Sequence, residues 1–188
     1  PLLRGKTIDV ARDAAFCFIY PANIDCLNAL GARLCFFSPL ADRTLPECDA
    51  VWLPGGYPEL HAAALAENRS LWTALAAHVE AGKALLAECG GMMTLFEKLY
   101  TLDGSAHPMA GLLPGSVRMQ KRLAGLGMQE VTLPEGVLRG HTFHYSQSET
   151  PLAPLSTSVH PAGRAGEAIY RRQRLTASYM HIYFPSNP

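Results

Sequence analysis

A cysteine at position 89 ends an apolar segment and is followed by two glycines, in the stretch LLAECGGMM. A nucleophile on a tight strand-to-helix turn needs small residues two positions before it and two after it, because the backbone there is strained. Ala87 and Gly91 meet this requirement. A helix that begins at Gly90 or Gly91 would point its N-terminus at the sulfur and lower the pKa of the thiol. We therefore predict a nucleophilic Cys89; the alternative is a small core residue at an ordinary turn.

A thiol nucleophile needs a general base, and the chain contains seven histidines. His181 lies in the stretch ASYMHIYF, in which apolar and polar residues alternate as in a strand that ends against a sheet. The residue pattern alone does not choose it over the others. The other histidines are His61, His78, His107, His141, His144 and His160.

Attack on a carbonyl group also needs N–H donors for the negative oxygen that develops on the substrate. The N–H of Gly90 directly follows the proposed nucleophile and suits this role. A second donor can come from Gly55 or Gly56 in LPGGYPE, where the missing side chain lets a substrate approach the backbone closely. A glycine pair is equally compatible with a plain turn.

The elements that must position these groups alternate along the first 100 residues. Apolar strand-like runs that alternate with helical segments indicate a parallel sheet covered on both faces, whose sites lie beyond the carboxyl ends of the strands. The remaining residues contain short strand-like pieces with many glycines and prolines, which predict sheet-edge strands and loops. Strands are expected within 6–16, 33–40, 48–56 and 83–89, and helices within 20–32, 61–82 and 90–99.

Bulk composition narrows the class of protein. With 188 residues, 48% of them hydrophobic and 17% charged, the chain can form one globular domain, which we place at residues 1–188. A formal net charge of zero argues against a nucleic-acid partner, and the one short basic run, RRQR at 171–174, fits a solvated turn or strand face. Five cysteines without CxxC spacing argue against a disulfide framework and a metal site, and favour the cytoplasm. No apolar run is long enough for a membrane span.

Six stretches together resemble a class I glutamine amidotransferase, and more narrowly the C-terminal glutaminase domain of the cobyrinic acid a,c-diamide synthase family. The stretches are VARDAAFCFIYPANIDCL, LGARLCFFSPLAD, LPGGYPELHAAALAEN, AECGGMMTL, RGHTFHYS and SYMHIYF. The resemblance implies an α/β, flavodoxin-like sandwich with a mostly parallel central sheet and helices on both faces. It implies a ligase that hydrolyses glutamine to glutamate and ammonia, for ATP-dependent amidation of corrin-ring carboxylates in cobalamin biosynthesis.

The resemblance also implies roles for single residues. Cys89 matches the nucleophile, His181 the general base, and Gly56 and Gly90 the oxyanion-hole donors. Many class I amidotransferases carry an acid two residues after the histidine, a position held here by Tyr183; the acid is commonly missing in the cobyrinic acid branch, so the group that orients His181 is undefined. Three residues in family-characteristic segments are expected near the glutamine pocket: Glu59, Arg122 and His144.

The chain starts without a methionine, which suggests a segment of a longer protein. The family implies an N-terminal synthetase domain on the same polypeptide that needs ATP and magnesium. This chain lacks the GxxxxGK[ST] phosphate loop, so we expect it to need no cofactor itself. The alternatives are the glutaminase domain of cobyric acid synthase or a related tetrapyrrole amidase, a DJ-1/PfpI-like cysteine hydrolase, and a degenerate amidotransferase that serves for docking.

Overall fold

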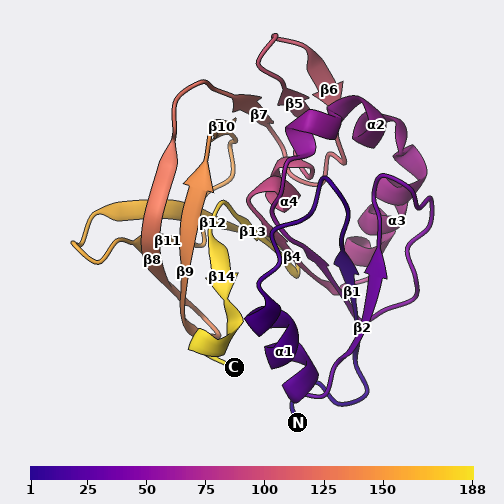
Figure 1. Ribbon diagram of the computed structural model, residues 1–188, viewed down its shortest axis with the longest axis vertical. Coiled ribbons are helices and arrows are strands. Elements are labelled where there is room, and N and C mark those ends of the chain that lie inside the picture. The colour runs from indigo at the N-terminus through magenta and orange to yellow at the C-terminus, as the bar shows by residue number, and fades with distance from the viewer.

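The apolar runs of the first 100 residues form the parallel half of a ten-stranded sheet. In the computed structural model, which describes residues 1–188, four of these runs are joined by one strand from near the C-terminus (Figure 1). All adjacent pairs in this half are parallel, so the carboxyl ends of the strands meet at one edge. In spatial order the strands are β2 (Arg33–Phe37), β1 (Thr7–Ala11), β3 (Ala50–Leu53), β4 (Ala84–Glu88) and β13 (Leu175–Ser178).

The C-terminal residues extend the same sheet with five antiparallel strands. The prediction of strands without further βα units is therefore confirmed, but these strands make up half of the main sheet instead of trimming its edge. The longest pair, β8 with β9, is a hairpin whose residues alternate between buried and exposed. Continuing from β13, the order is β12 (Ala165–Arg172), β11 (Ser156–Val159), β8 (Gly125–Leu133), β9 (Gly136–His144) and β14 (His181–Tyr183).

A second sheet of four short strands lies apart from the main one. It is built from segments between the fourth parallel strand and the β11 strand, and it is antiparallel except for one pair. Its strands are β10 (Ser146–Glu149), β7 (Ser116–Met119), β5 (Lys98–Tyr100) and β6 (Ala106–Pro108).

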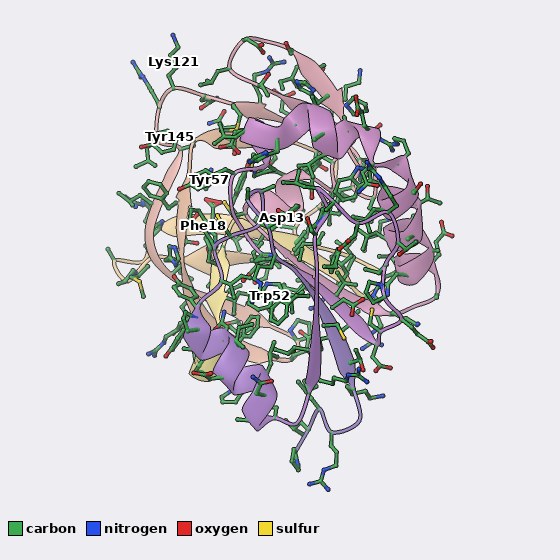
Figure 2. All side chains as sticks on the ribbon, turned by 45° about the vertical axis from the view of Figure 1, so that its right-hand side comes forward. Asp13, Phe18, Trp52, Tyr57, Lys121 and Tyr145 are labelled. Atoms are coloured by element: carbon green, nitrogen blue, oxygen red, sulfur yellow. The ribbon has the colours of Figure 1, made fainter.

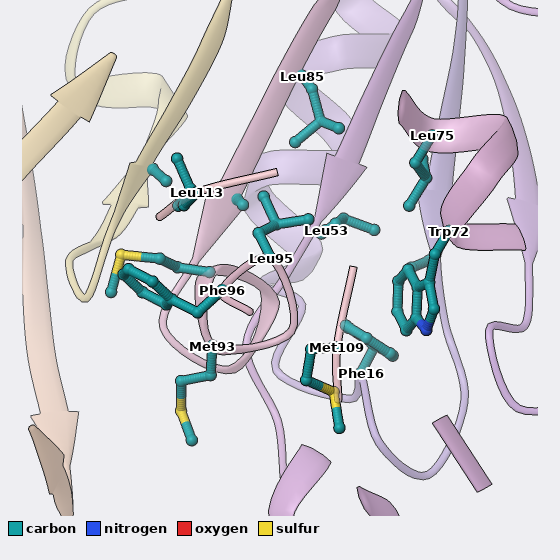
Figure 3. Packing of buried hydrophobic residues seen from close by; sticks show 14 of the residues in the cluster. Phe16, Leu53, Trp72, Leu75, Leu85, Met93, Leu95, Phe96, Met109 and Leu113 are labelled. Atoms are coloured by element: carbon teal, nitrogen blue, oxygen red, sulfur yellow. The ribbon is translucent and has the colours of Figure 1, made fainter. Parts of the chain in front are cut away.

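Helices cover both faces of the parallel half, as predicted. On β3, Val51 and Leu53 belong to the large core cluster with α3, whereas Trp52 packs on the opposite face beside α1. Figure 3 shows Leu53, Leu85 and the α3 residue Trp72 within the large cluster. The helical elements are α1 (Pro21–Ala29), η1 (Pro58–His61), α2 (Ala62–Glu67), α3 (Arg69–Glu80), α4 (Gly90–Met93) and η2 (Phe184–Ser186).

The helix predicted within 90–99 is wrong in length. It makes a single turn, α4, and the chain has become strand β5 by Lys98. Leu95, Phe96 and Leu99 are fully buried in the large core cluster, so the apolar run reflects burial of the whole segment and not one face of a helix. None of the helices combines the length and the hydropathy needed to cross a membrane.

Candidate active site

Cys89 occupies a tight turn between β4 and α4. Its backbone has φ 47° and ψ −109°, a left-handed conformation that costs a non-glycine residue roughly 1–3 kcal/mol. The turn is held in place by the Cys89 N–H, which donates to the carbonyl oxygen of Ser178 at 2.7 Å. The end of β3 packs closely against the turn, because a Cβ atom at Gly91 would lie 2.1 Å from the Leu53 carbonyl oxygen. The strained strand-to-helix turn predicted from the small residues is therefore present.

We expect Gly91→Ala to destabilise the chain by roughly 1–3 kcal/mol, because the backbone of Leu53 must move to admit the methyl group. For a domain of this size that lowers the melting temperature by several degrees, measurable by circular dichroism. Gly163→Ala, whose Cβ would meet open space, isolates the cost of a positive φ, which Gly91 does not carry. A Gly91→Ala melting temperature equal to that of the wild-type protein would contradict the close packing under the turn.

Gly56 and Gly90, the predicted oxyanion donors, lie side by side. A Cβ atom at Gly90 would be 3.0 Å from the Gly56 nitrogen, and one at Gly56 would be 2.2 Å from the Ala15 carbonyl oxygen, so neither site has room for a side chain. The Gly56 N–H makes no hydrogen bond within the chain. The Gly90 N–H favours the thiolate of Cys89, and the Gly56 nitrogen lies close to Gly90, so the two backbone donors are near each other beside the cysteine turn.

His181 reaches the same place from the far end of the chain. Strand β14 pairs with β9, so that His181 lies opposite His141, and the two rings stack with centroids 4.7 Å apart. The His181 ring also covers Gly55, where a Cβ atom would be 2.4 Å from its Cε1 atom. The Tyr20 hydroxyl hydrogen-bonds to Nδ1 of His141. The candidate base is therefore enclosed between a glycine and a second histidine.

Burial keeps both candidate groups neutral at pH 7. It raises the pKa of the Cys89 thiol to about 12, and the carboxylates of Glu59, Glu167 and Glu88 add to the effect. It lowers the pKa of His181 to about 4. The expectation of a depressed thiol pKa is therefore wrong: the Gly90 N–H does favour the thiolate, but a one-turn helix does not outweigh full burial. Ionisation of Cys89 must be coupled to a base.

A cavity of about 320 Å³ adjoins His181. The thiol of Cys89 is 4% exposed, and it donates to the carbonyl oxygen of Phe143, a cavity residue, at 3.8 Å. Phe18 and Tyr57 pack edge to face beside the opening and lie on the same side of the molecule (Figure 2). The cavity is lined by Cys17, Phe18, Ile19, Tyr20, His141, Phe143 and His181. A larger cavity, of about 460 Å³, lies on the α1 face of the sheet and includes none of the candidate residues.

The three residues expected near a substrate pocket lie in different surroundings. Glu59 is half-buried in η1, close enough for its charge to raise the pKa of Cys89. Arg122 lies exposed in the loop between β7 and β8, and its side chain makes no hydrogen bond or ion pair. His144 points inward: Nδ1 bonds to the Ser146 carbonyl oxygen, and Nε2 pairs with Glu167 at 3.1 Å.

Sequence reasoning allowed either His141 or His144 to approach the site but assigned the substrate pocket to His144, and it missed Tyr20; of these three residues, His141 and Tyr20 line the cavity. Strand alternation is the signal that finds the first, because side chains two apart share a face of a strand. His141 therefore lies on the same face as Phe143, and His144 on the buried one. No local pattern identifies Tyr20, which reaches the cavity from the loop before α1.

A family model described as the CobB/CobQ-like glutamine amidotransferase domain matches residues 7–188. The chain is 56% identical over 187 residues to a hydrogenobyrinate a,c-diamide synthase of Pseudomonas aeruginosa, covering 99% of this chain and 43% of that protein. It is 53% identical over 190 residues to a cobyrinate a,c-diamide synthase of Herminiimonas arsenicoxydans, covering 100% of this chain and again 43% of the relative. The chain thus spans less than half the length of these relatives.

Solved structures share the fold at low sequence identity. A crystal structure of a glutamine amidotransferase superposes with a TM-score of 0.63 at 18% identity, covering 96% of this chain and 93% of that one. The structure of PurLQS from Thermotoga maritima gives a TM-score of 0.62 at 14% identity, covering 94% and 87%.

Proposed function

Because this chain belongs to the CobB/CobQ-like glutamine amidotransferase domains, we propose that its candidate site hydrolyses the side-chain amide of glutamine with Cys89 as nucleophile and His181 as base. The observation that carries the proposal is the convergence of a strained cysteine turn, two paired glycine N–H groups and an enclosed neutral histidine at one edge of the sheet. These are the parts that acyl transfer requires.

In the proposed reaction, His181 takes the proton of the Cys89 thiol as the sulfur attacks the amide carbon. The Gly56 and Gly90 N–H groups hold the resulting oxyanion. His181 then returns the proton to the amide nitrogen, so that the C–N bond breaks and ammonia leaves a thioester on Cys89. A water molecule, deprotonated by the same histidine, hydrolyses the thioester to glutamate and restores the thiol.

Glu59 is our candidate for holding the substrate's α-ammonium group. Its carboxyl is half-buried and makes no hydrogen bond to another side chain, and burial raises its pKa, so an incoming cation would be favoured there. We assign His144 to holding Glu167, whose carboxylate charge acts on Cys89. Arg122 lies exposed in the β7–β8 loop, and its role near the glutamine pocket stays a prediction.

We further propose that the ammonia serves a cobyrinate or hydrogenobyrinate a,c-diamide synthase, the activity named for the relatives. The remainder of those proteins leaves room for an ATP-dependent synthetase domain. We expect this chain itself to need no ATP, because its one GKT sequence, residues 5–7, runs into β1 instead of following a strand and opening a helix. Five free cysteines support a reducing, cytoplasmic setting.

The test compares substrates of the rival classes on the same protein. We expect release of glutamate and ammonia from L-glutamine, measured by coupled glutamate dehydrogenase, and no conversion of methylglyoxal or of a peptide. L-Asparagine, one methylene shorter, is the matched control and should react far more slowly, because its amide carbon falls short of the sulfur when the α-ammonium is held. Turnover of methylglyoxal or peptide without glutamate release would favour a DJ-1/PfpI-like hydrolase and contradict the proposal.

A further inference from the structure

Strand β14, which carries His181, has a strand neighbour on one side only. It ends the order of the main sheet and pairs with β9. The peptide groups of Ile182 point to the other side, where no strand lies. Backbone groups that are buried need partners, and those of Ile182 find them in two buried side chains instead of a strand.

The first of these side chains is Glu88, the residue that precedes Cys89. Its Oε2 accepts from the Ile182 N–H at 2.6 Å, and its Oε1 accepts from the Trp52 indole N–H at 2.8 Å. Only 2% of Glu88 is exposed. The Glu88 carboxylate, next to Cys89 at the end of β4, thus binds the backbone of Ile182, next to His181 in β14. These two strands are far apart in the sheet order.

The second side chain is Asn23 of α1, which is 1% exposed. Its amide nitrogen donates to the Ile182 carbonyl oxygen at 2.8 Å, and its amide oxygen accepts from the Phe184 N–H at 2.8 Å. Asn23 therefore completes the edge of β14 that Glu88 begins. Both polar groups of Ile182 are fixed by side chains with no freedom to move into solvent.

We propose that Glu88, assisted by Asn23, is a positioning residue that holds His181 in register with Cys89. The inference rests on the proposed glutaminase function. This arrangement does not need an acid two residues after His181. The Glu88 carboxylate, on the strand that leads to Cys89, instead fixes the backbone next to His181. Tyr183, at the position two after His181, is 43% exposed. We therefore assign the positioning of His181 to Glu88.

The charge state of Glu88 should make the rate of glutamate release depend on pH. Burial raises its pKa to about 7, so protonation below that pH puts an O–H where the Ile182 or Trp52 N–H points. The ionisable groups whose charges interact with Glu88 titrate elsewhere: burial raises the pKa of Tyr20 above its usual range and that of Cys89 to about 12. Burial lowers the pKa of His181 itself to about 4.

The test is Glu88→Gln, which keeps the size of the side chain but turns an NH₂ group toward one of the two N–H donors. For the chain and for the full-length protein, we expect kcat for glutamate release to fall about 10- to 100-fold with KM within twofold of wild type. The wild-type rate should decline as pH falls through 7, and the variant should lack that limb. Asp9→Asn, a fully buried carboxyl on β1 without contact to β14, is the matched control and should change neither quantity.

Asn23→Asp tests the other half of the arrangement, because it keeps the acceptor for the Phe184 N–H and loses the donor to Ile182. It should also lower kcat at constant KM, and it decides the matter if Glu88→Gln does not fold. A wild-type kcat and an unchanged acid limb in the variants would overturn the positioning role while glutamate release itself stands. Absence of glutamate release from the wild-type protein would overturn the proposed function and this inference together.

Discussion

Replacement of Cys89 by alanine should abolish glutamate release from glutamine, lowering kcat by roughly 1,000-fold or more. The sulfur forms the covalent bond in the proposed reaction, and Cys17, the other thiol at the cavity, does not lie on a strained strand-to-helix turn. The fold should persist, because alanine is small, apolar and suited to a position that is 4% exposed. In the full-length protein, added ammonium should still support amidation in the variant, since the thiol serves only to produce ammonia.

The measurement pairs glutamate release with melting temperature and with labelling by a chloroketone analogue of glutamine. Cys48→Ala is the matched control, because Cys48 is 6% exposed in the same core cluster as Cys89 but its sulfur lies near His78, away from the cavity. That variant should release glutamate and be labelled at the wild-type rate. Glutamine-dependent turnover that survives in Cys89→Ala would show that the nucleophile is another residue.

Replacement of His181 by asparagine should lower kcat about 100- to 10,000-fold at pH 7, through loss of the general base. The pH dependence follows from the thiol. With a pKa of about 12, the Cys89 thiolate fraction rises tenfold per pH unit below that value, so the variant should gain rate steadily between pH 7 and 10. The wild-type protein should gain only about twofold, as Glu88 completes its ionisation just above pH 7, because a histidine with a pKa of about 4 is already in its basic form throughout this range.

Steady-state rates across this pH range check the prediction, with His107→Asn as control. His107 lies in β6 of the small sheet and does not line the cavity, so its replacement should leave the profile unchanged. A His181→Asn profile that is parallel to the wild-type profile would mean that another group takes the proton of Cys89. His141, stacked on His181, would then be the residue to replace.

The parallel half of the fold follows from the sequence because its signals are local. Buried runs such as 48–56 and 83–89 form strands, and glycines in the left-handed region, Gly31 and Gly82, each stand two residues after the last residue of the helix that they end. The antiparallel half was underestimated for the opposite reason. Its strands alternate in burial and are separated by short turns, so only their pairing with distant segments shows that they extend the same sheet.

The candidate site likewise has one part that the sequence predicts and one part that it does not. The turn at Cys89 could be predicted, since its need for Ala87 and Gly91 lies within four residues of sequence. The setting of His181 could not, because it depends on Glu88 and Asn23, which lie 94 and 159 residues from Ile182 along the chain. The thiol pKa was mispredicted because burial, which raises it, is a property of the assembled fold.

The enclosure of Cys89 also bears on the chemistry of oxidation. Peroxide attacks thiolates, and a sulfur that is 4% exposed with a pKa of about 12 offers almost none. Cys17 is exposed at the wall of the same cavity, and it is the sulfur that an oxidant entering from solvent meets first. In the proposed reaction, Cys89 loses its proton to His181 only as the sulfur attacks the substrate. Between turnovers the thiol is thus protected from conversion to sulfenic acid.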